Sequence, residues 1–427
     1  MKILFILQYI PYPLDSGGNQ AMFNMIDKIR EHHEVSLLIY IRTKADEVNI
    51  SMLRNIWDNV TFYTHKDKEI IGPTSCTYKL LKYIQQSFTR KVNRRYRKWE
   101  LQQGSRNFDD IFVRNNSCLF NNFIEFSKEY GEYVYQISRK GFDIIQVEFF
   151  ESLPLIYLLP ENTTNVFVHH EIRFVRTENI LKVLHENTPN DILQRDMLKD
   201  LEIRALSRYD KIIVLTETDR QILLNENPNL DIYVSPAVVK FTNDKYLKFG
   251  NPSNELVFIG GGWHFPNVDG LLWFCRDVIP VLSSKIDNIK LNIVGKWPDM
   301  HKEHVKKIFP QANFVGFVDD LNAYSNGKIS IVPIRIGSGM RMKILDSIVS
   351  CSPIVTTTKG MEGLPLNNGE DCYITDVAED FADAIMTLIK NPELQNRFVE
   401  NAQNKLNIML NFQELQQKRI DFYSKIK

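Results

Sequence analysis

The chain has 427 residues, of which 44% are hydrophobic and 24% charged, and its 52 basic residues balance its 52 acidic ones. This composition is that of a globular protein with roughly two to three domains, and it excludes disordered, collagen-like and disulfide-dense chains. A chain without net charge has no overall field that could hold nucleic acid, so we expect no nucleic-acid partner.

The N-terminal segment has the pattern of a strand, a turn and a helix. Residues 3–7 form an apolar run that leads into prolines without a cleavage pattern, so it indicates a buried strand and not a signal peptide. A loop with Gly17 and Gly18 follows, then apolar residues at helical spacing, then a second apolar run over 35–41. This order predicts a βαβ unit of a parallel sheet.

The region 67–140 fits this alternation poorly. Between residues 79 and 98 it carries eight basic residues and no acidic one, and apolar residues are interspersed among them. We expect a basic helical insert there, which either lies on an anionic membrane surface or is a solvated helix.

Two further sets of apolar runs alternate with helical patterns. The first set ends near 234–239, and the second follows a polar stretch at 242–254. We therefore predict an N-terminal Rossmann-like domain at 1–240, a C-terminal one at 241–410, and a final helix at 411–427. The predicted strands after the first unit are 142–147, 164–169, 211–215, 256–259, 290–294, 314–315, 329–332 and 354–357. Ligands of such folds bind at the carboxyl ends of the strands.

No stretch of the chain reaches the ~20 apolar residues that a membrane span needs. We expect a cytoplasmic protein, at most peripheral at the inner face of the membrane. The five cysteines are widely spaced and include no CxxC pair, so we predict neither a disulfide framework nor a zinc site.

Two stretches resemble a Walker loop and an HExxH metal motif but do not have the spacing that these motifs require. In the glycine-rich stretch Gly337–Lys343 the lysine lies too far from the glycines for a Walker loop. His169 and His170 resemble the start of HExxH, but Phe174 stands where the second histidine would be. Adjacent histidines on a strand also point to opposite faces, so we predict no metal site.

The loop after the run 329–332 has the composition of an anion site. Its glycines allow the backbone to approach a ligand, and the amides at the start of the next helix favour a negative charge. Arg341 and Lys343 add two cations, which outlines a site for a diphosphate.

Residues 331–364, with GSGMRMKILD and then PIVTTTKGMEGL, resemble the donor-binding segment of family 4 (group 1) glycosyltransferases of the GT-B fold. The resemblance covers most of the chain in order, apart from 67–140, and the supporting matches are Gly17–Gly18, Phe258–Gly260, Trp263–Asn267, Val294–Gly295 and Val315–Val318. It implies two Rossmann-like domains that face a central cleft, with a C-terminal helix that crosses back to the first domain.

The resemblance also implies roles for single residues. Asp346 matches a glutamate that accepts hydrogen bonds from the ribose hydroxyls of a nucleotide, and Lys343 neutralises the diphosphate leaving group. Arg341 either assists Lys343 or is only solvated. His170 resembles a histidine that faces the donor sugar, and the alternative is a partly exposed histidine at a strand end.

Backbone groups hold the remaining parts of the donor in this family. The positions that match are Gly316 and Phe317 for the base, Gly360, Met361 and Glu362 for the sugar, Gly17 and Gly18 for the phosphates, and Gly260, Gly261, Ser338 and Gly339 around them.

The sequence departs from the family at Ser338, where a glutamate commonly contacts the donor sugar, and Glu362 is our candidate to replace it. Pro266 and Asn267 are predicted to cap a helix, with Asn267 at its start. Trp263 and Trp297 are predicted to pack against the cleft wall.

The function implied is transfer of a sugar from a nucleotide diphosphate sugar to a hydroxyl of a saccharide or lipid-linked saccharide, in the synthesis of a cell-envelope polysaccharide or glycolipid. Retention of the anomeric configuration, no cofactor and no metal are implied with it. Two alternatives stay open: a nucleotide-sugar epimerase of the same fold, and a non-catalytic sugar-binding partner in a glycan assembly complex.

Overall fold

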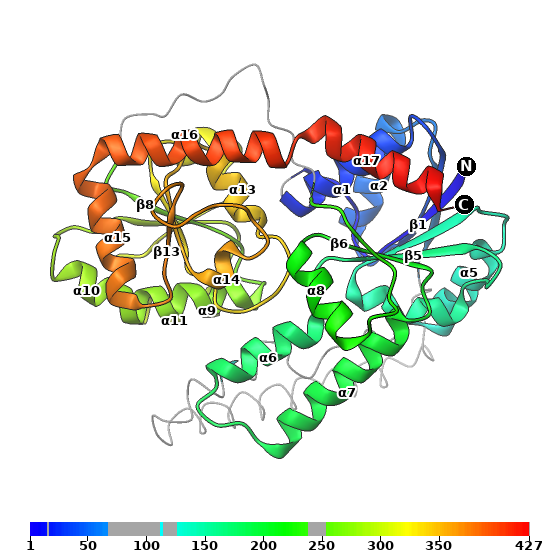
Figure 1. Cartoon of the computed structure of the whole chain (residues 1–427), viewed down its shortest axis with the longest axis horizontal. Helices are drawn as coiled ribbons and strands as arrows, with labels where there is room; N and C mark the ends of the chain where they lie inside the picture. Colours follow the sequence, from blue (N-terminus) through cyan, green and yellow to red (C-terminus); the bar gives the residue numbers. More distant parts are fainter. Residues whose placement is uncertain (15–16, 67–111, 114–125, 238–252, 427) are drawn as a thin grey trace, which may run out of the picture.

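A computed structural model describes residues 1–14, 17–66, 112–113, 126–237 and 253–426. These residues form two parallel β-sheets that lie side by side, each with helices on both faces (Figure 1). We call residues 1–237 the N-terminal half and residues 253–410 the C-terminal half. The predicted GT-B arrangement of two Rossmann-like units is confirmed, whereas the boundary predicted at 240/241 lies outside the described residues.

The sheet of the N-terminal half has the strand order β3-β2-β1-β4-β5-β6-β7. Its strands are β1 (Lys2–Leu7), β2 (Glu34–Tyr40), β3 (Thr61–His65), β4 (Ile144–Glu148), β5 (Thr164–His169), β6 (Lys211–Val214) and β7 (Ile232–Val234). The strand order reverses between β1 and β4, and a crevice for ligands forms at such a switch point. We did not predict β3, a five-residue edge strand in which no residue is fully buried.

The helices of this half cover both faces of the sheet. They are α1 (Gly17–Ile29), α2 (Lys44–Ile56), α5 (Lys128–Ser138), the 3-10 helix η1 (Phe150–Leu158), α6 (Arg173–Val183), α7 (Pro189–Leu206) and α8 (Glu217–Glu226). α5 lies within the predicted insert 67–140 and is helical, but the basic residues 79–98 lie outside the described residues.

The sheet of the C-terminal half has the order β10-β9-β8-β11-β12-β13, with its own switch point between β8 and β11. Its strands are β8 (Leu256–Ile259), β9 (Leu291–Val294), β10 (Asn313–Gly316), β11 (Ile329–Val332), β12 (Ile354–Thr356) and β13 (Tyr373–Ile374). All but the two-residue β13 were predicted.

The helices of this half are α9 (Phe265–Trp273), a π-helical turn η2 (Phe274–Val278), α10 (Ile279–Ser283), α11 (Asp299–Ile308), α12 (Leu321–Ser325), α13 (Met342–Val349), α14 (Thr358–Met361), α15 (Ala378–Lys390) and α16 (Pro392–Met409). None of the helices in the described ranges is long and apolar enough to cross a membrane.

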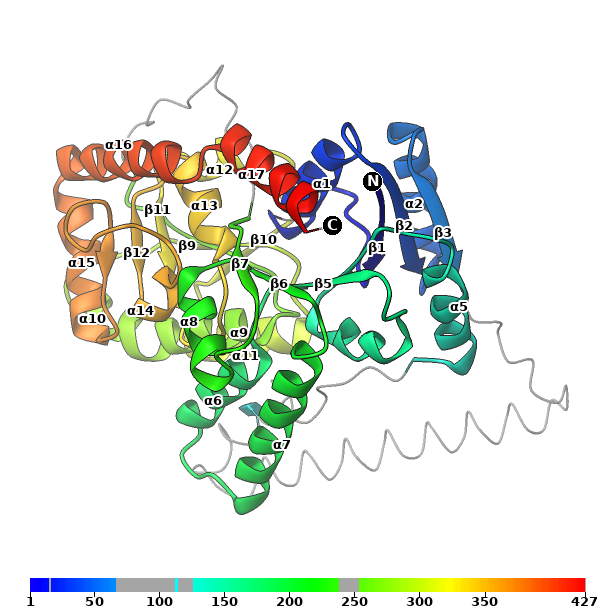
Figure 2. The ribbon, with the colours of Figure 1, turned by 45° about the vertical axis from the view of Figure 1, so that its right-hand side comes forward.

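The last helix, α17 (Phe412–Lys425), leaves the end of α16 and returns to the N-terminal half, where it lies beside α1 (Figures 1 and 2). Nε2 of Gln416 donates a 2.8 Å hydrogen bond to the backbone oxygen of Asn24 in α1, and the ring of Phe422 stacks on that of Tyr233 at 4.5 Å. The predicted C-terminal helix that crosses back is therefore confirmed.

The two halves also share an apolar contact. Met22, Met25 and Ile26 of α1 belong to one buried cluster with Met340 and Ile344, which lie at the start of α13. Because α1 follows β1 and α13 follows β11, this contact brings the two switch points together.

Candidate active site

The glycine-rich loop between β11 and α13 rests directly on the N-terminal half. A Cβ atom at Gly339, whose φ is +79°, would lie 2.3 Å from the backbone oxygen of His170. The backbone amide of Gly339 donates to Oδ1 of Asp219 at 3.3 Å, and Nδ2 of Asn179 donates to the oxygen of Gly337 at 3.1 Å. Glycine is therefore required at Gly339 both for the backbone conformation and for the close approach.

Ser338 joins the two halves. Its Oγ accepts a 2.6 Å hydrogen bond from the backbone amide of Ile172, which begins the turn into α6, and the serine is only 2% exposed. At the position where the family commonly has a glutamate, this chain thus has a side chain that bonds to the opposite half.

Arg341 is enclosed by acidic residues, so it is not solvated. Its side chain is 10% exposed, lies 3.8 Å from the Glu362 carboxylate and donates from Nη1 to the oxygen of Ser338. Burial lowers the pKa of Arg341, while Glu171, Glu362 and Asp219 oppose that shift. Nε and Nη2 donate no hydrogen bond to another group in the part of the chain that the structure describes.

Glu171 is the strongest counter-charge in this region. Its carboxylate lies 3.0 Å from Nη1 of Arg176. Burial would raise the pKa of Glu171, but Arg176, Arg173 and further cations outweigh burial and hold this pKa at about 2. Glu171 therefore stays ionised at neutral pH.

Lys343 lies in the first turn of α13 and reaches back to the end of β8. Its Nζ donates to Oδ1 of Asn267, and Nδ2 of Asn267 donates to the oxygen of Gly261 at 2.8 Å. A Cβ at Gly260 would lie 2.7 Å from Nδ2 of Asn267, so the glycine makes room for this amide.

Asn267 is a site residue that we did not predict. We expected it to cap a helix, but the capping position of α9 is His264, and Asn267 lies within the first turn. The helix starts earlier because Pro266 fits the first turn, where its missing N–H costs nothing. The Asn267 side chain is then free to bridge Gly261 and Lys343.

Lys343 and Asp346 lie one turn apart on α13 and form a coupled pair. Burial, together with the charge of Arg341, lowers the pKa of Lys343 to about 7. Burial also raises the pKa of Asp346 to about 7, against the opposite effect of Lys343. Both groups thus titrate near neutral pH, where the charge of a ligand can decide their state.

The end of β10 lies beside the loop that follows β9. The oxygen of Gly316, at φ +85°, accepts a 2.7 Å hydrogen bond from the amide of Gly295, and the side chain of Phe317 is 51% exposed. The structure thus places both predicted base-binding positions at the carboxyl edge of the second sheet, with an exposed aromatic ring at its rim.

The two tryptophans of this edge behave differently. Trp297 is buried, and its Nε1 donates to the oxygen of Gly260 at 2.8 Å, as the prediction of a wall residue requires. Trp263 is 82% exposed, so the same prediction for it is wrong. The reason is Gly262, on whose Cα the ring of Trp297 packs so closely that a Cβ would lie at 2.5 Å. Trp297 therefore already occupies the wall position that we predicted for Trp263.

The amides of Gly360 and Met361, which we predicted to hold the donor sugar, are bonded within the chain. They donate to the side-chain oxygen and the backbone oxygen of Thr357, at 2.9 and 3.0 Å, because Thr357 caps the short helix α14. Glu362, which follows, lies 2.9 Å from Nζ of Lys359 as well as near Arg341.

His170 follows β5 and pairs with a buried carboxylate. Its Nε2 lies 2.6 Å from Oε2 of Glu148 at the end of β4, and the ring of Phe149 stacks on it at 4.1 Å. The preceding histidine, His169, points to the other face and lies 2.7 Å from Glu202. The two histidines therefore cannot share a metal, as their spacing predicted.

A cavity of about 240 Å³ opens beside His170. Its lining comes from α1 with Gly18, from the ends of β4 and β5, from Met340 and Met342 of the C-terminal half, and from Arg419 of α17. This cavity thus brings the glycines at the start of α1, where Gly17 begins the helix, together with His170 and the glycine-rich loop.

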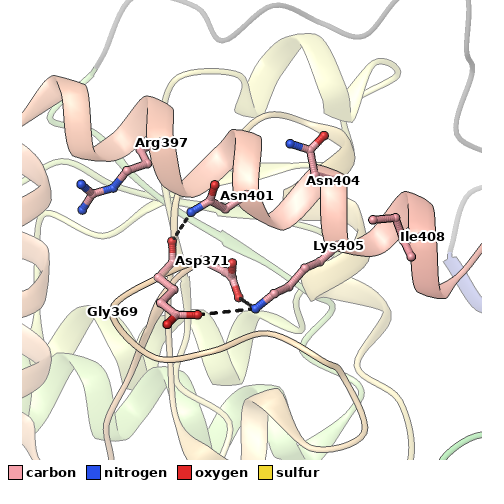
Figure 3. A pocket seen from close by; sticks show the side chains of 8 residues that line it. Gly369, Asp371, Arg397, Asn401, Asn404, Lys405 and Ile408 are labelled. Carbon is pink, nitrogen blue, oxygen red and sulfur yellow. Dashed lines mark hydrogen bonds and ion pairs between the residues drawn. The ribbon is translucent and has the colours of Figure 1, made fainter.

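A larger hollow, of about 510 Å³, lies elsewhere between α16 and the segment before β13 (Figure 3). There Nζ of Lys405 bonds to the carboxylate of Asp371, and Nδ2 of Asn401 donates to the oxygen of Glu370 at 2.8 Å. None of the predicted site residues lines it. Across the described ranges, no three His, Cys, Asp or Glu side chains are grouped so that they could hold a metal ion.

Comparison with known proteins agrees with this geometry. Residues 253–391 match the family model of "Glycosyl transferases group 1". The chain is 23% identical over 403 residues to an uncharacterized 44.6 kDa protein in the cps region of Klebsiella pneumoniae, with 91% of each chain covered.

Solved structures share the fold at low sequence identity. A mutant of S. aureus TarM in complex with Fondaparinux, alpha-GlcNAc-glycerol and UDP superposes with a TM-score of 0.64 at 12% identity, over 98% of this chain and 99% of that one. HepE of Anabaena in complex with UDP and glucose gives 0.61 at 12% identity, over 99% of both chains. The chain therefore has the GT-B fold, and its residues 253–391 are similar to the group 1 glycosyl transferases.

Proposed function

We propose that this protein is a glycosyltransferase that moves a sugar from a UDP-sugar to a hydroxyl group of a saccharide acceptor, in the synthesis of a capsular polysaccharide. The single observation that carries the proposal is that Lys343 at the start of α13, one turn from Asp346, bonds to Asn267 of α9 and follows a glycine-rich loop that contacts His170. The group 1 family match, the UDP in the TarM and HepE complexes, and the cps-region relative support it.

The donor binds along the carboxyl edge of the second sheet. The diphosphate takes the place beside Lys343, where the amides at the start of α13 and the cation of Arg341 also favour an anion. Its negative charge favours the protonated amine of Lys343, whose pKa is about 7. The carboxylate of Asp346 accepts hydrogen bonds from the ribose, and the backbone at Gly316 and Phe317 contacts the base.

Transfer takes place where the donor sugar meets His170 beside the 240 Å³ cavity. The bond between the anomeric carbon and the β-phosphate oxygen breaks, and its electron pair stays on the diphosphate. A new bond forms from the anomeric carbon to the acceptor oxygen, and the acceptor's proton passes to the departing diphosphate. The configuration at the anomeric carbon is retained. No metal takes part, because the cationic groups of Lys343 and Arg341 stabilise the charge that develops on the diphosphate.

We propose that the acceptor is a saccharide carried on a lipid. The basic residues 79–98 would then hold the protein at an anionic membrane surface. Co-sedimentation with vesicles tests this step: more protein should sediment with anionic than with neutral vesicles, and equal binding to both would contradict it.

The proposed activity is tested in two stages. UDP, GDP and ADP are first compared by calorimetry, where we expect UDP to bind most tightly and Lys343→Ala to weaken its binding by roughly 10- to 100-fold, the loss of a hydrogen bond to a charged group. Lys285→Ala, at a surface lysine paired with Asp383, is the matched control and should leave binding unchanged.

A panel of UDP-sugars is then incubated with lipid extracts, and the products are analysed by mass spectrometry. Transfer to a saccharide lipid supports the proposal. Conversion of a UDP-sugar to its epimer without acceptor would identify an epimerase instead, and binding without turnover over the whole panel would identify a non-catalytic sugar-binding protein.

A further inference from the structure

We infer that Glu148 sets the tautomer of His170, and that a directed chain of buried hydrogen bonds from α17, through Arg419, Tyr423 and Gln146, holds and orients the Glu148 side chain. These four are positioning residues: they act through His170 and not on a substrate. The importance of His170 for transfer rests on the proposed function, whereas its tautomer does not.

The chain is continuous, and its members are almost fully buried along one side of the 240 Å³ cavity. Arg419 donates from Nε to Oγ of Ser235 at 3.0 Å and from Nη1 to Oη of Tyr423 at 3.5 Å, the longest link. Tyr423 Oη bonds to Oε1 of Gln146 at 2.5 Å, and Nε2 of Gln146 bonds to Oε1 of Glu148 at 2.5 Å. Arg419, Tyr423, Gln146 and Glu148 are each no more than 5% exposed.

The chemistry of Arg419 at one end and of the Glu148 carboxylate at the other fixes the direction of every hydrogen bond. A guanidinium can only donate, so the oxygen of Tyr423 accepts from Arg419 and its hydrogen points to Gln146. The amide of Gln146 must then present its oxygen to Tyr423 and its NH₂ group to Glu148. An ionised carboxylate can only accept, so the remaining oxygen of Glu148 requires a proton on Nε2 of His170. Nδ1 is consequently the acceptor of the neutral ring.

A second device fixes the plane of the same ring. Phe149 has φ of +70°, a backbone conformation that is rare and unfavourable for an aromatic residue. This backbone conformation places the Phe149 ring over the His170 ring, with 15° between the two planes. The rings of Phe149 and Tyr9 meet edge to face, with 4.8 Å between their centroids. Strained backbone of this kind persists where the surrounding structure over-determines it, and such positions cluster at functional sites. Phe149 thus fixes the ring plane, and Glu148 fixes which nitrogen carries the proton.

The test is Glu148→Gln, which keeps the shape of the side chain. The oxygen of the new amide still accepts from Gln146, so its NH₂ group faces His170 and donates. Nε2 must then accept, and the proton moves to Nδ1. Imidazole ¹⁵N NMR of the full chain measures the tautomer directly. The His170 signal is identified because it is missing from the spectrum of His170→Asn.

We expect the Nε2–H tautomer in the natural protein and the Nδ1–H tautomer in Glu148→Gln. His169, which pairs with Glu202 on the other face, is the internal control and should not change. An Nδ1–H tautomer in the natural protein, or no change in Glu148→Gln, would overturn the inference.

A second pair of variants, made in the Glu148→Gln background, tests the link to α17. Adding Tyr423→Phe removes the hydroxyl that orients Gln146, so the new amide can take either orientation and a mixture of tautomers should appear. Adding Tyr233→Phe removes a hydroxyl that reaches the same helix at the oxygen of Lys418, 3.3 Å away, and should leave the Nδ1–H tautomer unchanged. An unmixed Nδ1–H signal after Tyr423→Phe would show that α17 does not orient the chain. If Glu148→Gln does not fold, the tautomer of the natural protein still tests the role of Glu148.

Kinetics separate this inference from the proposed function. In a working transfer assay, Glu148→Gln should lower kcat by at least about tenfold, the scale of a misplaced acid–base group, with little change in the KM for UDP-sugar. If the tautomer switches but no panel substrate reacts even with the natural protein, the proposed function fails and the inference stands. If the tautomer switches and kcat is unchanged, the chain of hydrogen bonds is structural and its role in positioning for transfer is refuted.

Discussion

The hydroxyl of Ser338 accepts a 2.6 Å hydrogen bond from the backbone amide of Ile172, a residue of the opposite half of the molecule. The glycine on each side of Ser338 also contacts the N-terminal half, through Asn179 and Asp219. The tip of the glycine-rich loop is therefore a contact that closes the cleft. The departure from the family at this position need not mean that the site has lost its chemistry, because the serine has a defined partner.

Ser338→Ala should lower the free energy of unfolding by about 1–3 kcal/mol, because the buried amide of Ile172 then has no partner. Urea denaturation measures this change. Ser424→Ala is the control, since that hydroxyl only bonds to the oxygen of Ile420 within α17, and its removal should have almost no effect. Equal effects of the two substitutions would show that the contact across the cleft adds no stability.

Gly363→Ala should destabilise the protein more than Gly369→Ala. Both glycines have nearly the same φ, +79° and +78°, so the backbone strain of roughly 1–2 kcal/mol is common to both. At Gly363, however, a Cβ would lie 2.1 Å from Cγ2 of Thr216, whereas at Gly369 no atom lies within 4 Å. Overpacking adds about 1–3 kcal/mol more at Gly363.

The origin of that difference can be tested by thermal or urea unfolding of a double variant. Thr216→Ser removes Cγ2 but keeps the hydroxyl that caps α8 by accepting from the amide of Asp219. Thr216→Ser combined with Gly363→Ala should recover part of the excess loss, because the contact with Cβ of Thr216, at 2.8 Å, remains. If it recovers none, the clash with Thr216 is not the cause.

Binding of UDP should weaken as the pH rises through 7. The pKa of Lys343 lies at about 7, below its ordinary value, so its charge is present below pH 7 and is lost above it. An anion binds the charged amine, and between pH 6 and pH 8 the charged fraction falls by about tenfold. Calorimetry at several pH values measures the effect.

Lys343→Arg serves as the reference for this titration, because a guanidinium stays charged over the whole range. The titration of UDP is common to both proteins, so the difference between the two curves reports Lys343 together with its effect on Asp346. Parallel curves would show that Lys343 does not titrate in this range or does not contact the ligand.

Asn267→Ala should weaken UDP binding by roughly three- to tenfold, the effect of one hydrogen bond that orients Lys343. Asn313→Ala removes a side chain that bonds to another asparagine in the same sheet, Asn292, and is the matched control. If Asn267→Ala binds UDP as the natural protein does, Lys343 is held by other groups.

The fold could largely be predicted because strands of a parallel sheet are buried on both faces and therefore read as continuous apolar runs. Residues 3–7, 256–259 and 329–332 are of this kind, and they became β1, β8 and β11. β3 was missed because it is an edge strand whose residues, TFYTH, are exposed or half-buried and form no continuous apolar run.

The candidate site could be predicted only where it is local in sequence. Lys343 and Asp346 lie three residues apart after a glycine-rich turn, a pattern visible without a structure. Asn267 and Tyr423 lie 76 and 277 residues from the partners to which they bond, so no local spacing connects them. The contrast between Trp263 and Trp297 likewise depends on packing at Gly262, which a sequence pattern cannot show.

The return of α17 to the N-terminal half has a consequence for how the protein is made. During synthesis the N-terminal half leaves the ribosome first and can fold before the rest of the chain exists. At that stage His170 and Glu148 are already in place at the ends of β5 and β4, but the tyrosine and arginine that orient Gln146 have not yet been translated. The nascent chain therefore lacks the groups that order these hydrogen bonds, and the ordered chain forms only once α17 has been added.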